Sequence, residues 1–285
     1  MRALVLSGGG AHGGYEVGAI KYLMGDLGNQ YQTFTGVSVG AINAAFLAQY
    51  PVADQKQAAA DLYALWASLK DSDVKNNWFP LGIVHALWLD SAYNSNALWS
   101  LVRNKVSLAK IRASGNKVAV SATCVNTGDY RTFTQDDDDF IDGVLASCSY
   151  PMGLKPIVID GQKYTDGGVR HVTPISEAVK FGPTELDIII CGPVQTSAAF
   201  SDVDAITYGL RCFSIMQDQM QMSDLKILAL YNRLIAAGLE HDKQMLDIKM
   251  IRPASDLAGS SLTFDQSVIA PLLTQGYNEA KIQYK

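Results

Sequence analysis

The sequence has few cysteines, and none of them lie close together. No C-x-x-C pair occurs, and each cysteine stands in apolar surroundings. A disulfide framework or a typical zinc site needs a more closely spaced set. We therefore expect buried free thiols in a reducing compartment and no metal site. The four cysteines are Cys124, Cys148, Cys191 and Cys212.

Positive charge is also scarce. The 285 residues include 23 Lys and Arg against 28 Asp and Glu, and no Lys/Arg-rich run occurs. Proteins that bind nucleic acid normally gather an excess of positive charge into a patch. A formal net charge of -5 therefore argues against nucleic acid as a partner.

Long hydrophobic runs are absent as well. The N-terminus has one arginine and a short apolar run that ends in glycines. This run is too short for a signal-peptide core, and no segment has the length of a membrane span. Because we also find no repeat and no clear linker, we expect one cytoplasmic domain over residues 1–285.

The sequence does contain an alternation of strand and helix patterns. Apolar runs at 2–6 and 31–37 predict strands, and helical patterns follow at 13–27 and 39–50. This order is typical of a parallel sheet with helices on its faces. The fold class we expect is therefore α/β.

The rest of the chain adds hairpins, strands and helical regions. Residues 54–112 read as a helical insertion, and the part after about 200 as mainly helical. The remaining predicted elements are hairpins at 117–134 and 156–166, strands at 186–192 and 246–251, and helices at 201–238 and 264–282.

The second predicted strand runs into the pattern Gly36-Val37-Ser38-Val39-Gly40, and a helix of small residues follows. A serine between glycines at a strand-to-helix turn is the arrangement of a nucleophile elbow. The glycines permit a tight turn that exposes the serine, and the helix N-terminus directs its positive end at the hydroxyl. An ordinary N-cap serine fits the pattern equally well.

The first predicted strand ends in the glycine-rich stretch S-G-G-G-A-H-G-G. Gly8, Gly10 and Gly13 match the dinucleotide fingerprint, which also requires an acidic residue at the end of the second strand. Ser38 stands near that position instead. Since neighbouring parallel strands end side by side, the loop amides can face Ser38 and stabilise an oxyanion. The predicted donors are the amides of Gly8, Gly9, Gly10, Ala11 and Val39.

A nucleophilic serine needs a base. The four histidines (His12, His85, His171 and His241) lie in no motif that selects one of them. A carboxylate is the alternative: the stretch Y-T-D-G-G places Asp166 at the end of a hairpin, before two glycines that permit close backbone approach. A histidine triad and a serine–carboxylate pair both remain open on these residues.

Taken in order, these motifs resemble those of the patatin-like phospholipase family. The resemblance covers most of residues 1–190, including the stretch 146–168. It implies a three-layer sandwich with a mostly parallel central sheet flanked by helices. It also implies acyl hydrolase activity on lipid esters, with no metal or other cofactor. The supporting motif residues are His12, Gly13, Gly36, Gly40, Gly167 and Gly168.

The resemblance further implies a catalytic dyad, with Ser38 as nucleophile and Asp166 as its base. Because a carboxylate is a weak base for a serine, we expect burial to raise the pKa of Asp166. His12 departs from the Arg or Lys that many members carry, which weakens any role for a fixed positive charge. His171 and His241 are expected to be structural or surface residues.

A lipid substrate implies transient, peripheral association with a membrane, under an activator that the sequence does not identify. The stretch 78–89 fits either an interfacial patch or a helix pair that covers the core. The methionine-rich stretch 215–222 fits either an acyl pocket or core packing. A nucleotide-binding module and a non-catalytic lipid-binding relative remain the alternative functions.

Overall fold

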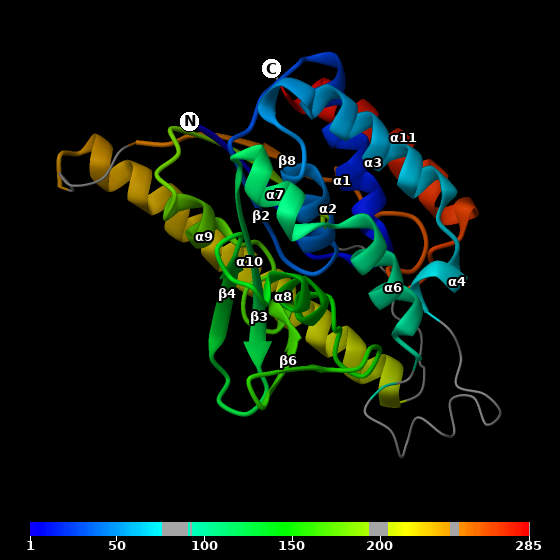
Figure 1. Ribbon diagram of the computed structural model, residues 1–285. Helices are drawn as coiled ribbons and strands as arrows, with labels where there is room; N and C mark the ends of the chain where they lie inside the picture. The colour runs from blue at the N-terminus through cyan, green and yellow to red at the C-terminus, as the bar shows by residue number, and fades with distance from the viewer. Residues whose placement is uncertain (76–90, 92, 194–204, 240–244, 285) are drawn as a thin grey trace.

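The computed structural model describes residues 1–75, 91, 93–193, 205–239 and 245–284. A sheet of eight strands, in the order β5-β6-β3-β2-β1-β7-β8 with β4 also paired to β3, forms the centre of the molecule (Figure 1). Its strands are β1 (Arg2–Leu6), β2 (Thr33–Gly36), β3 (Lys117–Cys124), β4 (Tyr130–Thr134), β5 (Ile157–Ile159), β6 (Gln162–Asp166), β7 (Glu185–Ile189) and β8 (Asp247–Ile251).

The sheet is mostly parallel, as the α/β prediction requires. Strands β3, β2, β1, β7 and β8 run in the same direction, whereas β4, β5 and β6 form the antiparallel part. The register pairs Leu6 of β1 with Gly36 of β2. The loops that follow these two strands therefore emerge next to one another at the same edge of the sheet.

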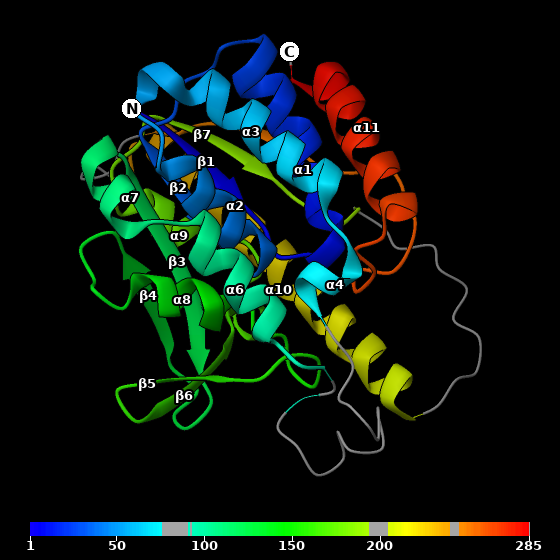
Figure 2. The same cartoon turned by 45° about the vertical axis from the view of Figure 1, so that its right-hand side comes forward.

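Helices cover both faces of the sheet, which gives three layers (Figures 1 and 2). On one side lie α1, α2, α3 and α11, and on the other α9 and α10. The helices are α1 (Gly13–Ile20), α2 (Val39–Ala48), α3 (Gln55–Ser68), α4 (Asp71–Val74), α6 (Asn96–Lys105), α7 (Leu108–Ser114), α8 (Phe140–Ser147), α9 (Ile175–Val179), α10 (Ala205–Ala236) and α11 (Gln266–Gln283).

The continuous apolar character of β1 follows from this layering. Leu4 and Leu6 belong to the larger core, under α1 and α2, whereas Ala3 and Val5 belong to the smaller core, which includes Leu228 of α10. Successive side chains of a strand point to opposite faces, so a strand covered on both faces is apolar throughout.

Most predicted elements recur with shifted ends. The strand predicted at 2–6 has those bounds, while the helix predicted at 13–27 consists of α1 followed by a π-helical segment, Lys21–Asp26. None of the described helices combines the length and apolar character that crossing a bilayer requires. The stretch 78–89, with His85, and His241 lie outside the described residues, so the predictions made for them stay predictions.

Two expectations about side chains need correction. All four cysteines are free, but Cys212 on α10 is only partly buried. In the methionine-rich stretch 215–222, Met216 is 60% exposed and Met220 and Met222 are half-buried, and none of the three lines the cavity described below. The physical reason is that α10 turns its polar side chains inward at this point, as the site below shows.

Candidate active site

Ser38 stands at the turn between β2 and α2 in a strained backbone conformation. Its φ of 55° and ψ of -127° are sparsely populated for a residue with a side chain. The turn is tight: a Cβ at Gly36 would lie 2.1 Å from the Gly40 carbonyl oxygen, and one at Gly40 would lie 2.5 Å from that of Leu6. The two glycines of the motif therefore allow the close backbone approach that exposes Ser38.

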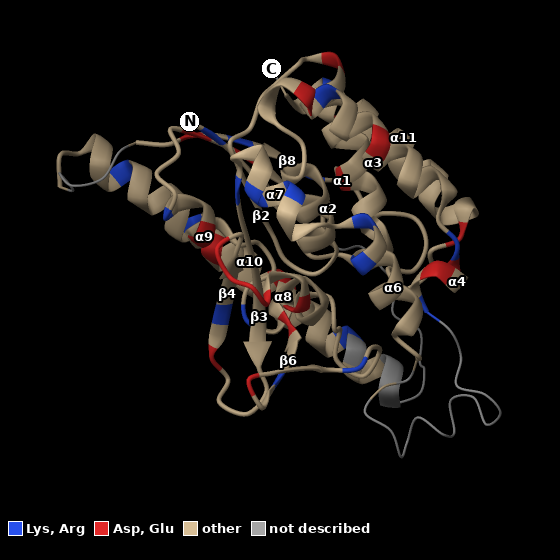
Figure 3. Ribbon diagram, viewed as in Figure 1, with Lys and Arg blue, Asp and Glu red and all other residues tan. Residues whose placement is uncertain are grey.

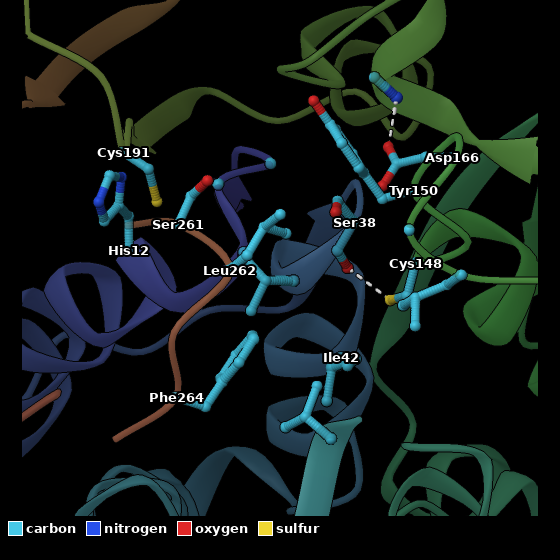
Figure 4. Close-up of a pocket in the computed structure, with 18 of the residues that line it drawn as sticks. His12, Ser38, Ile42, Cys148, Tyr150, Asp166, Cys191, Ser261, Leu262 and Phe264 are labelled. Atoms are coloured by element: carbon cyan, nitrogen blue, oxygen red, sulfur yellow. Dashed lines mark hydrogen bonds between the residues drawn. The ribbon is translucent and has the colours of Figure 1, made fainter. Parts of the chain in front are cut away.

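Two residues from the end of α8 hold the backbone of this turn. The Ser38 amide donates to the Ser147 hydroxyl (3.0 Å), and the Cys148 thiol donates to the Ser38 carbonyl (2.9 Å; Figure 4). Sequence reasoning did not assign a role to this pair. Its signal was present as a run of small polar residues, Ser147 to Ser149, at the end of an apolar helix.

Asp166, the last residue of β6, brings a buried carboxyl group to Ser38 (Figure 4). It is 1% exposed, and its Oδ1 accepts a hydrogen bond from the Gly168 amide at 2.7 Å. Burial raises the pKa of Asp166 to about 7, although the Ser38 hydroxyl and the Gly168 amide act in the opposite direction. Its Oδ2 has no hydrogen-bond partner of ordinary geometry within the described ranges.

The glycine-rich loop after β1 packs directly against the serine. A Cβ at Gly8 would lie 3.3 Å from the Cβ of Ser38. The Gly8 amide donates to the carbonyl of Val172 (2.9 Å) and the Ala11 amide to that of Ser261 (2.7 Å). Two of the five predicted oxyanion donors are thus engaged in this conformation. Among the described residues, the amides of Gly9, Gly10 and Val39 have no such acceptor.

The loop of residues 252–265, between β8 and α11, covers the glycine-rich loop, and we call it the covering loop. Besides the bond between Ser261 and Ala11, the ring of His12 donates from Nε2 to the carbonyl of Gly259 (3.2 Å). Burial lowers the pKa of His12, so the ring is neutral at neutral pH. His12 therefore attaches the covering loop and does not bring a positive charge to the glycine loop.

A cavity of about 650 Å³ opens over Ser38 and Asp166. Helices α2, α3 and α6 line it with apolar side chains, whereas α10 lines it with polar ones. Figure 4 shows Ile42, Leu262 and Phe264 on one side of Ser38, with Asp166 and Tyr150 on the other. The site can therefore accept an apolar chain and hold a polar group next to it.

Behind the glycine loop lies a buried carboxyl group that sequence reasoning missed. Glu16 of α1 is fully buried; it accepts a hydrogen bond from Asn43 of α2 (3.0 Å), which in turn accepts one from Trp66 of α3 (3.0 Å). Burial raises the pKa of Glu16 to about 8. The available signal was a single glutamate in the otherwise apolar stretch 13–20.

His171, close to Asp166 in sequence, lies elsewhere. Its Nδ1 pairs with Asp224 of α10 at 3.2 Å, which raises its pKa, and it lines a second cavity on the α9–α10 side. No group of three or more potential metal ligands occurs in the described part of the chain.

Residues 4–179 match the family model of the patatin-like phospholipases. The chain belongs to this family. The match includes the glycine loop, the Ser38 turn and Asp166. Two curated relatives of the patatin-like chain are an uncharacterised protein of Acanthamoeba polyphaga mimivirus, R571 (27% identity), and the mouse 1-acylglycerol-3-phosphate O-acyltransferase Pnpla3 (25%).

These relatives are longer than the matched region. The alignments cover 62% and 79% of this patatin-like chain but only 61% and 55% of R571 and Pnpla3. Among solved structures, VipD of Legionella pneumophila is similar at 13% identity and a TM-score of 0.48, and the match covers 99% of this chain and 66% of VipD. The type III effector ExoU is similar at 14% identity and a TM-score of 0.39, and the match covers 99% of this chain and 53% of ExoU.

Proposed function

We propose that this protein hydrolyses fatty-acyl esters of lipids through a Ser38–Asp166 dyad. The observation that carries the proposal is the pairing of a serine in a strained turn with a buried carboxyl group whose pKa is raised to about 7. Membership of the patatin-like phospholipase family supports a lipid ester as substrate.

In the first step, Asp166 takes the proton of Ser38 as the serine oxygen attacks the ester carbonyl. A carboxylate whose pKa lies near the working pH is a much better base than an ordinary aspartate. The amides of Gly9, Gly10 and Val39 are the donors left for the developing oxyanion, and each such donor contributes about 3 kcal/mol to lowering the barrier. Ser147 and Cys148 keep the turn in place during the attack.

In the second step, the alcohol part of the lipid leaves with the proton from Asp166, and the acyl group remains on Ser38. Asp166 then activates a water that releases the fatty acid and restores the serine. The apolar wall of the cavity suits the acyl chain, and the polar side chains of α10 suit the part of the lipid nearest to the headgroup.

The proposal fits better than a nucleotide-binding module. A dinucleotide site carries an acidic residue at the end of its second strand, where this chain has Ser38. The Gly8 and Ala11 amides, which would have to hold a phosphate, already donate to backbone carbonyls. A non-catalytic lipid-binding relative would have no need for a strained serine beside a buried base.

The direct experiment measures fatty-acid release from phospholipid vesicles by mass spectrometry. We expect release by the wild-type protein and loss of at least about a thousandfold in Ser38→Ala. Equal release by a well-folded Ser38→Ala would refute the proposal. Adding a lysophospholipid acceptor separates hydrolysis from acyl transfer, the reaction in the name of the mouse relative.

A further inference from the structure

Exposed large apolar side chains are concentrated on α10. Six of the fifteen that the described residues contain lie on this helix. At about 100° per residue, all six fall within about 160° of the helix circumference, so they share one face. They are Tyr208, Ile215, Met216, Ile227, Leu230 and Tyr231, with exposed fractions from 39% to 61%. Ile227 and Tyr231, at one border of this face, also line the second cavity on the α9–α10 side.

The opposite face of α10 forms a wall of the candidate active site. Gln217 donates to the carbonyl of Gly168 (2.9 Å), two residues from the base, and Gln221 donates to the Thr173 hydroxyl (2.8 Å). Because a helix with its side chains is only ~10 Å thick, Ile215 and Met216 on the exposed face lie about one helix diameter from the cavity wall that Gln217 helps to form.

The charges of α10 are divided between its two faces. Its exposed charged residues are Lys226 and Arg233, whereas Asp218 and Asp224 are half-buried. Figure 3 marks Lys and Arg in blue and Asp and Glu in red along the ribbon. Asp218 lines the active-site cavity, and Asp224 pairs with His171. A protein of net charge -5 thus presents apolar and positive side chains, and no described acidic one, on this face.

We propose that the exposed face of α10 docks the protein on an anionic lipid bilayer. The helix lies in the plane of the headgroups, with Ile227 and Leu230 at the boundary of the acyl chains. Lys226 and Arg233 contact anionic headgroups, where a cation gains from the negative surface potential. The inference rests on the proposed function for one point only, that the substrate is a lipid in a bilayer.

A bilayer fits this face better than a protein partner does. A bilayer presents an extended surface, and the exposed apolar side chains are spread over residues 208–231 of α10, a length of about 35 Å. Docking along that length brings the wall of the cavity to the lipid surface, so that a lipid enters the site without crossing water.

Vesicle binding of proteins in the Ser38→Ala background tests the proposal, because no lipid is consumed there. The docking variant is Ile227→Asp/Leu230→Asp, which replaces two side chains that are each 53% exposed. The matched control is Val158→Asp/Ile282→Asp, on β5 and α11, with side chains 62% and 65% exposed.

We expect the docking variant to bind vesicles of phosphatidylcholine and phosphatidylserine at least about tenfold more weakly than its parent. The control variant should bind as the parent does. Lys226→Glu/Arg233→Glu should abolish the preference for these vesicles over phosphatidylcholine alone. Equal vesicle binding by the docking variant and the control, or no vesicle binding by the parent, would overturn the proposal. So would a protein partner whose binding requires this face when vesicle binding does not.

A second readout separates this inference from the proposed function. With Ser38 intact, the docking variant should hydrolyse a soluble short-chain ester at the wild-type rate, which also shows that it is folded. If no protein hydrolyses any ester but vesicle binding still depends on α10, docking stands and the proposed function fails. If hydrolysis depends on Ser38 but the substitutions on α10 do not change vesicle binding, the proposed function stands and the docking proposal fails.

Discussion

At the scale of single residues, the site depends on the unusual environment of one carboxyl group. Asp166 is buried at the end of an antiparallel strand, and one of its oxygens lacks a partner within the described part of the chain. An unpaired buried carboxylate is costly, so the group holds its proton to higher pH than an exposed aspartate. The burial that makes Asp166 a usable base therefore also lowers the stability of the folded protein when this carboxyl group is ionised.

The pH dependence of activity should follow Asp166. Because the base must be ionised and burial raises its pKa to about 7, kcat/KM for a soluble ester should be level above pH 7. Below that point it should fall about tenfold per pH unit. Initial rates from about pH 5 to about pH 9 measure this profile. A profile without an inflection near neutrality would contradict the assignment.

Replacing the base should stabilise the fold at alkaline pH. The folded protein binds this proton more tightly than the unfolded chain, whose pKa is near 3.8. Stability is therefore lost as pH rises from about 4 to about 7, by up to about 4 kcal/mol. Asp166→Asn removes this cost, so its melting temperature should exceed that of the wild type at alkaline pH, with the gain shrinking towards pH 4.

The control for this measurement is Asp138→Asn, whose carboxyl group is 96% exposed and whose replacement should have little effect on melting. If Asp166→Asn instead melted below the wild type at both ends of the pH range, the carboxylate would be stabilising. The pKa of Asp166 would then not be raised by burial.

At the scale of elements, three helices are joined by one buried polar chain. Trp66, Asn43 and Glu16 connect α3, α2 and α1 beneath the loops of the active site. This connection fixes the direction of α1 and α2, the two helices whose N-terminal ends carry the glycine loop and the serine turn. We therefore assign Glu16 and Asn43 a role in stability, at a distance from the substrate.

Removing the middle member of this chain should be strongly destabilising. Asn43→Ala leaves the Trp66 indole N–H buried without its acceptor and removes one hydrogen bond from the buried Glu16 carboxyl group, which costs about 2–4 kcal/mol. Urea denaturation at neutral pH measures the loss. The exposed pair of Gln57 and Asp61 provides the control, since Gln57→Ala should change stability by less than about 0.5 kcal/mol. Equal midpoints for the two variants would contradict this account.

Helix α10 shows where element-scale prediction succeeds and where it fails. Its existence was predictable from a long helical pattern, which placed it at 201–238 against the observed Ala205–Ala236. The sequence did not predict which face of the helix packs inward. Polar side chains of α10 line a cavity and several large apolar ones remain exposed, which is the opposite of the usual arrangement. Only the position of the helix beside Gly168 reveals that arrangement.

At the scale of the whole molecule, the sequence predicted the parts that follow from local patterns. The α/β class, the parallel strands and the turn at Ser38 all depend on short-range periodicity and glycine spacing. Contacts between distant segments were not predictable. Buried Asp187 accepts from Tyr31 (2.6 Å) and Tyr284 (2.8 Å), so three widely separated segments meet at one carboxyl group.

The same limit applies to the candidate site. The motifs named Ser38 and Asp166, and the structure brings them together from β2 and β6 through the pairing of both with β3. The covering loop was not foreseen, because nothing local in residues 252–265 indicates that Ser261 will accept from Ala11. Its place over the glycine loop results from the docking of α11 on α1, which is a property of the complete fold.

The most direct test of the central claim is labelling with a fluorophosphonate, followed by peptide mapping. The probe should attach to Ser38 in the wild-type protein and in His171→Ala. Labelling should slow sharply in Asp166→Asn and disappear in Ser38→Ala. Attachment to a different residue, or undiminished labelling of a folded Ser38→Ala, would contradict the claim.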